Sequence, residues 1–212
     1  MRRKGLIGKK LGMTQIFDPE SRLAIPVTVV EVGPNTVTQV KTLETDGYVG
    51  VQVGYQEQKP QRVKKPQLKH FEKAGTAPFK ILKEFGMPSE DVKAGDVINV
   101  SMFEEGTVVD VTGTTKGRGF QGVIKRFNGA TGDKTHGGHC YRIPGSIGNC
   151  STPSKVWKGV KMPGHMGSVR RTMQNVTVVK KDEDRNLLYL KGAVPGHKTG
   201  TILVRESAKL RG

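Results

Sequence analysis

The chain has 212 residues, of which 34% are hydrophobic, and its 35 Lys and Arg against 19 Asp and Glu give a formal net charge of +16 at pH 7. So basic a protein repels itself when compact, and the charge makes sense when a polyanion such as nucleic acid neutralises it. No run of about 18 apolar residues and no long basic amphipathic helix is present, which argues against a membrane partner, and two cysteines are too few for a disulfide scaffold.

The first residues form a basic cluster that consists of Arg2, Arg3, Lys4, Lys9 and Lys10. No apolar stretch follows the first charges, so we expect no signal peptide and a reduced, cytoplasmic protein. A second basic patch holds Lys59, Arg62, Lys64, Lys65 and Lys69. Each patch either contacts RNA or supplies surface charge for solubility.

Short runs of β-branched and apolar residues, separated by turn residues, predict a mainly β fold. The expected strands are residues 25–32, 36–41, 49–55, 97–102, 107–112, 176–180, 187–191 and 202–205. Gly33, Gly47 and Gly106 stand in the turns between them, where glycine supplies the positive φ that tight turns need.

Helix signals are sparse. The clearest one covers residues 67–74, which follow Pro66 and precede Gly75. A second short helical turn is expected from Ser89.

Residues 115–175 differ from the rest of the chain. They contain 11 Lys or Arg, one acid (Asp133) and 12 of the 28 glycines. Aliphatic residues are few and show no period of 2 or 3.6, so the segment cannot bury a core of its own. Its four aromatic residues are Phe120, Phe127, Tyr141 and Trp157.

This composition suits RNA. Lys and Arg neutralise phosphates, glycine lets the backbone approach them, and aromatic faces stack on unpaired bases. The alternative is a solvated loop whose aromatic residues pack locally, and for Trp157 both a stacking role and a small local core remain open.

The pattern predicts an all-β architecture with an insertion. Residues 1–113 and 176–212 would close one antiparallel barrel or sandwich, and residues 114–175 would leave it as a long, basic, glycine-rich extension. A structureless loop of this length is acceptable when a partner orders it. We therefore expect folding and RNA binding to be coupled in this extension.

Other functions lack their sequence context. Residues 117–122 spell GxGxxG, but no long helix, no acid about 20 residues on and no kinase catalytic motif follows. The segment also contains four side chains of metal-ligand type, namely His136, His139, Cys140 and Cys150. Their spacing lacks the paired ligands of structural zinc sites. No nucleophile–base pair stands out, and we interpret Asp110 as structural, so we predict no enzyme activity, metal, cofactor or small-molecule substrate.

Nine residues stand at the spacing of a known signature, namely Phe103, Asp110, Gly113, Thr115, Gly117, Arg118, Gly119, Gly122 and Arg126. Further matching blocks are GLIGKKLGMT (5–14), HG (136–137), RIPGSIG (142–148), MPGHMG (162–167) and LKGAVPG (190–196). With these residues the chain resembles the L-three family of large-subunit ribosomal proteins, in its compact bacterial or organellar form.

The resemblance implies a β-barrel domain that binds large-subunit ribosomal RNA (rRNA) early in assembly, and an extension that runs toward the peptidyl-transferase region. The tip of that extension would be Gly148, Asn149, Cys150, Ser151 and Thr152. Asn149 stands where several relatives carry a Gln that is methylated in some, so no modification is carried over.

We expect rRNA contacts mainly from basic residues of the N-terminal cluster and the extension. The full set is Arg2, Arg3, Lys4, Lys9, Lys10, Lys116, Arg118, Lys125, Arg126, Lys134, His136, Arg142, Lys155, Trp157, Lys158, Lys161, His165, Arg170 and Arg171. The other expected partners are neighbouring large-subunit ribosomal proteins, and the expected location is the cytoplasmic ribosome, with an organellar ribosome as the alternative.

Two rival functions have weaker support. An RNA-modifying enzyme needs a cofactor loop or a carboxylate cluster, and neither is visible. A DNA-binding architectural protein shares the charge, but no groove-reading helix is recognisable.

Overall fold

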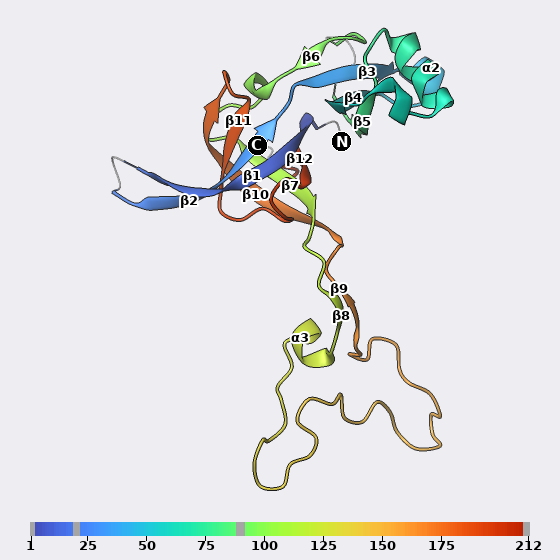
Figure 1. Cartoon of the computed structure of the whole chain (residues 1–212), viewed down its shortest axis with the longest axis vertical. Helices are drawn as coiled ribbons and strands as arrows, with labels where there is room; N and C mark the ends of the chain where they lie inside the picture. Colours follow the sequence, from blue (N-terminus) through green and yellow to red (C-terminus); the bar gives the residue numbers. More distant parts are fainter. Residues whose placement is uncertain (1–2, 19–21, 88–91, 210–212) are drawn as a thin grey trace. The chain divides into compact units, whose positions relative to one another are not determined.

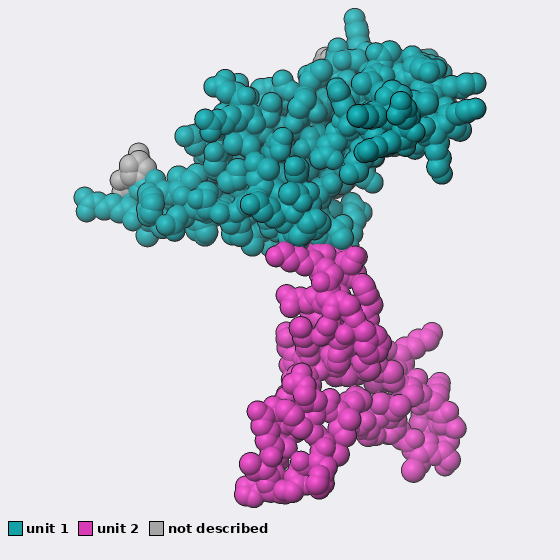
Figure 2. All heavy atoms as spheres, viewed as in Figure 1, with its two compact units in different colours: residues 1–114, 170–212 teal, residues 115–169 magenta. Residues whose placement is uncertain are grey.

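The structure, a computed structural model, describes residues 3–18, 22–87 and 92–209, and it divides into two compact units. Unit 1 consists of Met1–Thr114 and Arg170–Gly212, and unit 2 of Thr115–Val169 (Figure 2). The sequence placed the extension at residues 114–175, slightly wider than unit 2. The difference arises because residues 170–173 pair with residues 111–114 and so continue a strand of unit 1.

Figure 1 labels the strands and the helices α2 and α3. The strands are β1 (Gly5–Phe17), β2 (Ala24–Val32), β3 (Asn35–Lys41), β4 (Gly50–Glu57), β5 (Phe79–Phe85), β6 (Val97–Ile98), β7 (Val108–Thr114), β8 (Gly119–Gln121), β9 (Gly164–Met166), β10 (Arg170–Asp182), β11 (Leu187–Lys191) and β12 (Thr201–Glu206). The helices are α1 (Leu43–Asp46), η1 (Pro60–Arg62), α2 (Lys65–Ala74), η2 (Val100–Met102) and α3 (Val123–Phe127).

Six strands of unit 1 close an antiparallel barrel in the order β1-β12-β7-β10-β11-β2. Alternate side chains of each strand point inward and fill the barrel with apolar residues. The buried residues of this core are Leu6, Val30, Val32, Val100, Phe103, Val109, Val111, Val176, Val178, Leu188, Leu190, Val194, Ile202 and Val204. The structure thus confirms the mainly β fold. Of the two predicted architectures, a barrel or a sandwich, the structure has the barrel.

A second sheet, in the order β5-β4-β3-β6, belongs to the same unit and builds its own core. Two barrel strands contribute to both cores. On β1, Leu6 belongs to the barrel core and Ile7 to the second core, and on β12 Leu203 belongs to the second core while its neighbours belong to the first. At these positions both faces of the strand are covered, which explains the continuous apolar run at residues 202–204 of β12.

Helix α2 agrees with the helix that the sequence predicts and begins two residues earlier. Pro66 occupies the first turn, where its missing N–H costs nothing. Gly75 ends the helix at φ +65°, where its N–H donates to Glu72 O. Phe71 is buried and packs edge-to-face against Phe79, which fixes the helix on unit 1.

The structure contains all eight predicted strands, although only residues 97–98 of the expected run 97–102 are extended. The positive φ expected at the turn glycines 33, 47 and 106 is confirmed. Four strands (β1, β5, β8 and β9) and the short helices α1 and α3 were not predicted. The turn expected from Ser89 begins outside the described residues.

Candidate nucleic-acid interface

Unit 2 has no core. None of the residues 115–175 is buried, which confirms that this segment cannot fold around apolar side chains of its own. Unit 2 carries nine Lys or Arg against Asp133, and within the described part of the chain no salt bridge involves any of them. The positive charge of this unit is therefore not offset by ion pairs among the described residues.

A narrow antiparallel stem holds the two ends of unit 2 together. Thr115 N–H donates to Val169 O at 2.9 Å, and Arg118 N–H donates to Met166 O at 2.9 Å. Between these bonds lies Gly167 at φ +76°, and a Cβ at this position would overlap the carbonyl oxygen of Lys116. The two backbone segments of the stem can approach each other this closely only because residue 167 is glycine.

The stem continues into the β8–β9 pair and α3. Gly119 faces Met166 and Gln121 faces Gly164 in the strand register. The Arg126 guanidinium donates to Met162 O at 2.8 Å and lies where a side chain of residue 164 would be. Arg126 thus has a structural contact within unit 2 as well as a charge.

Three aromatic rings of unit 2 carry a cation on their faces. Distances from the cationic group to the ring centroid are 5.1 Å for Arg126 and Phe127, 4.9 Å for Lys134 and Tyr141, and 4.6 Å for Lys155 and Trp157. Hydrogen bonding to Lys134 also lowers the pKa of the Tyr141 hydroxyl. Such pairs hold an aromatic face and a positive charge at one spot, a combination that suits a stacked base beside its phosphate.

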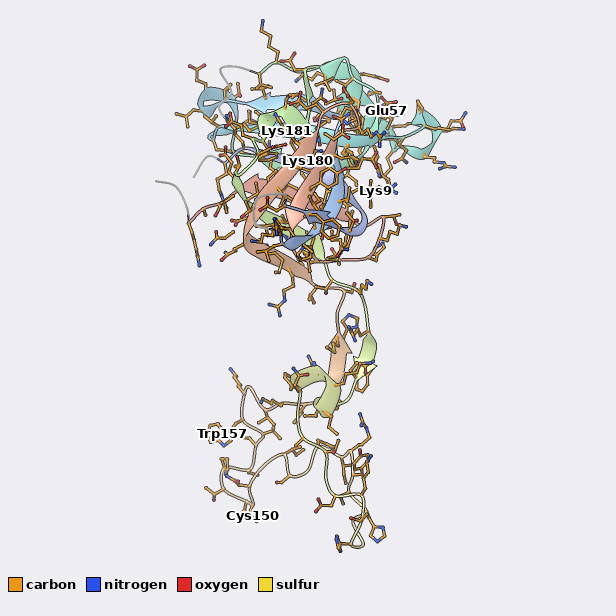
Figure 3. All side chains as sticks on the ribbon, turned by 90° about the vertical axis from the view of Figure 1, so that its left-hand side faces the viewer. Lys9, Glu57, Cys150, Trp157, Lys180 and Lys181 are labelled. Atoms are coloured by element: carbon orange, nitrogen blue, oxygen red, sulfur yellow. The ribbon has the colours of Figure 1, made fainter. Side chains whose placement is uncertain are left out.

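Trp157 is 56% exposed. Of the two roles expected for it, the small local core therefore does not form. Figure 3 shows its side chain and that of Cys150 on loops of unit 2. The expected tip residues, Gly148 to Thr152, are all exposed. Four of them, Gly148 to Ser151, line a hollow of about 490 Å³ together with Lys155 and Val156.

The N-terminal cluster is used partly by the protein itself. Arg3 forms a salt bridge with the buried Asp110 at 3.2 Å, and Lys10 donates to Val194 O at 2.7 Å. Lys4 is exposed, Lys9 is half-buried on β1, and Arg2 lies outside the described residues. Asp110 also accepts hydrogen bonds from the backbone of Asn175 and Ala208, in line with a structural role.

Arg170 and Arg171, at the start of β10, are exposed on unit 1. Burial, together with the charges of Arg170 and Arg3, lowers the pKa of Arg205, a residue that the sequence did not single out. Its ring-stacking on Phe85, with 5.1 Å between the guanidinium carbon and the ring centroid, holds it in place. The sequence signal that could have pointed to Arg205 is its position directly after the apolar residues 202–204 of β12.

The structure does not place the GxGxxG stretch or the side chains of metal-ligand type in the surroundings that a nucleotide site or a metal site needs. Residues 119–121 of the GxGxxG stretch form a three-residue strand, and the five-residue α3 follows, which is too short for a dinucleotide-binding helix. Among the described residues no group of three His, Cys, Asp or Glu side chains gathers as metal ligands. None of the helices in the described ranges is long and apolar enough to span a membrane.

Comparison with known proteins identifies the family of the chain. The family model "Ribosomal protein L3" matches residues 56–186, which include all of unit 2. "Large ribosomal subunit protein uL3" of Pseudomonas fluorescens SBW25, of Pseudomonas syringae pv. syringae B728a and of Pseudomonas aeruginosa LESB58 are each 52% identical over 209 residues, covering 98% of this chain and 99% of theirs. A match over nearly the whole of both chains shows that this protein belongs to the ribosomal protein L3 family.

Proposed function

We propose that this protein is a structural, non-catalytic constituent of the large ribosomal subunit, located in the ribosome in the cytoplasm. Its relatives are named as proteins of that subunit. The observation that carries the finer proposal is unit 2, a 55-residue segment without one buried residue and with nine basic side chains against one acid. A segment of this kind is stable only when bound to a polyanion.

In this proposal unit 2, with adjoining residues of β10, penetrates large-subunit rRNA as an extension of the barrel. Lys and Arg neutralise phosphates along its length, and the exposed rings of Phe120 and Trp157 contact bases or sugars. Gly148 to Thr152 form the tip nearest the peptidyl-transferase region. The RNA performs the chemistry there, and the protein positions it.

Early binding during subunit assembly follows from the difference between unit 1, which has a core, and unit 2, which has none. Unit 1 has its own core and folds without RNA, so it presents unit 2 to nascent rRNA as a mobile, basic segment. Neighbouring large-subunit proteins complete the set of partners. Electrostatic attraction speeds the first encounter, and ordering of unit 2 follows on the RNA.

Sedimentation of a cell extract through a sucrose gradient at low and high salt tests the role in the subunit. The chain should travel with the large subunit and resist the salt wash. A chain that stays at the top of the gradient under both conditions would overturn the proposal and reopen RNA-modifying and DNA-binding functions.

Amide hydrogen exchange on the free protein and on its rRNA complex tests the coupling of folding and binding. Residues 115–169 should exchange freely alone and become protected on RNA, while the barrel strands are protected in both states. Strong protection of residues 115–169 without RNA would contradict coupled folding.

A further inference from the structure

A second basic surface lies on unit 1, around η1 and α2. We name it the α2 basic face; its members are Lys59, Arg62, Lys64, Lys65, Lys69 and Lys73. All six side chains belong to exposed residues, and Glu72 is the one acid between residues 59 and 73. In the described ranges no salt bridge involves any of these six residues or Glu72.

Three of these lysines form a stripe on the helix. Lys65, Lys69 and Lys73 are spaced by four residues, so they lie on one side of α2, about 6 Å apart along its axis. Like charges at this spacing destabilise a helix. Repulsion along the stripe therefore works against the helix in the free protein, and of the three lysines only Lys73, in the last turn, is favoured by the helix dipole.

The N-terminus of α2 also holds positive charges at positions where they are unfavourable for the helix. Lys64 is the N-cap residue and makes no capping hydrogen bond with its side chain, Lys65 follows it, and the first turn contains no acid. The helix dipole places partial positive charge at this end, where cations are unfavourable and phosphate is favourable. The stripe and the cationic N-terminus, which share Lys65, both favour an anion along the same helix.

The helix is firmly supported on its other side. Phe71 is 2% exposed and packs against Phe79 with 6.1 Å between ring centroids. His70 Nε2 lies 2.8 Å from Gln52 Oε1 on β4. The lysines are thus presented by a helix whose position does not depend on RNA, in contrast to the cations of unit 2.

We infer that the α2 basic face is a preformed binding surface for the sugar-phosphate backbone of RNA, separate from unit 2. The inference rests on the proposed function. It gives the protein two kinds of RNA contact: a rigid one on unit 1 that binds as it is, and a flexible one in unit 2 that orders on binding. Because one chain links them, binding by the first raises the effective RNA concentration for the second.

The test uses the full-length chain with Lys65→Gln, Lys69→Gln and Lys73→Gln combined. The matched control changes three exposed lysines on other parts of unit 1, Lys80→Gln, Lys191→Gln and Lys198→Gln, and so removes the same charge. A third variant, with Arg at the three stripe positions, keeps the charge. The probe is deproteinised large-subunit rRNA from Pseudomonas fluorescens, and affinity is measured across salt concentrations.

The Gln stripe variant should bind about tenfold or more weakly and lose two to three units, at about 0.7–0.9 per contact, from the slope of log K against log salt. The control triple should lose less than about one unit, and the Arg variant should keep the wild-type slope. In thermal unfolding without RNA, the Gln stripe variant should melt at or above the wild-type temperature, because like-charge repulsion is removed. Weaker binding together with unchanged or higher stability is a combination that a purely structural role cannot produce.

Three results would overturn the inference: an unchanged slope, a loss that the control triple matches, or a stripe variant that unfolds at a lower temperature in proportion to its loss of binding. Wild-type protein that does not bind the rRNA at all would instead refute the proposed function, and the inference with it. The wild-type measurement therefore separates the two failures.

Discussion

Unit 1 and unit 2 belong to one chain but differ in what keeps them folded. Every buried hydrophobic residue among those described lies in unit 1, where two cores share the strands β1 and β12. Unit 2 has a short hydrogen-bonded stem, exposed rings and, among the described residues, no salt bridge to its cations. The comparison teaches that one sequence can specify one part by internal packing while another part lacks a core of its own, and in our proposal that second part is ordered by its RNA partner.

The largest expected difference concerns two phenylalanines. Phe103 is 1% exposed in the barrel core, and Phe120 is 76% exposed in unit 2. Phe103→Ala should lower the free energy of unfolding by about 3–5 kcal/mol, because it removes packing and leaves a cavity. Phe120→Ala should change it by no more than about 0.5 kcal/mol. Urea unfolding of the free proteins measures both, and equal losses would contradict the division into a self-stabilised and a partner-stabilised unit.

A second difference should appear in RNA binding. Changing Lys155, Lys158 and Lys161 together to Ala should reduce the salt slope of rRNA binding by up to about three units, since each lost phosphate contact removes up to about one. Thermal unfolding of the free protein should be unchanged, because unit 2 has no core to disturb. An unchanged slope would show that these lysines do not contact phosphate.

Gly167 offers a smaller and more local effect. Gly167→Ala combines a positive φ with overlap on Lys116 O, so it should strain the stem by about 1–3 kcal/mol. Binding to rRNA should weaken while the barrel unfolds as before. Gly122→Ala is the matched control, because no atom lies within 4 Å of a Cβ there and φ is −70°. If both variants bind like the wild type, the stem does not help to position unit 2.

The smallest effect concerns alkaline pH and unit 1 alone. Burial, with Glu31 nearby, raises the pKa of Tyr55 from 10.0 to about 12. Between these values the unfolded chain releases the phenolic proton and the folded protein keeps it, so stability falls as pH rises, by on the order of 1–2 kcal/mol from this group. Tyr55→Phe should flatten that part of the pH profile relative to wild type. A profile that Tyr55→Phe leaves unaltered would mean that this tyrosine ionises equally in both states.

The sequence predicted the strands that are runs of β-branched and apolar residues bounded by turn residues, such as β7 and β12. It missed β1 because glycines and the pair Lys9-Lys10 interrupt the run, although Gly8 is there for packing, since a Cβ would lie 2.7 Å from Glu31 O. It missed β5 because the exposed charges of Lys83 and Glu84 break the pattern between the buried Phe79 and Phe85. β8 and β9 are three residues each and are held by backbone bonds alone, which leave no apolar signature.

For the candidate interface, composition indicated where the charge lies but not which charges the protein uses itself. The salt bridge of Arg3 with Asp110 joins residues 107 positions apart, and the bond of Lys10 to Val194 O spans 184. No local pattern reveals such pairs. The stripe of Lys65, Lys69 and Lys73, in contrast, is visible from spacing once the helix is known, and it extends one turn beyond the predicted patch, which ends at Lys69.

The closure of the barrel has a consequence for the order of events during synthesis. β12 comes after every other strand in the chain, yet it pairs with β1 on one side and β7 on the other, and its register joins Leu6 to Val204. Until β12 leaves the synthesising ribosome, the edges of β1 and β7 that pair with β12 have no partner strand. Unit 2 is therefore translated and exposed before the barrel can close, so a nascent chain of this protein can meet RNA while its globular part is still incomplete.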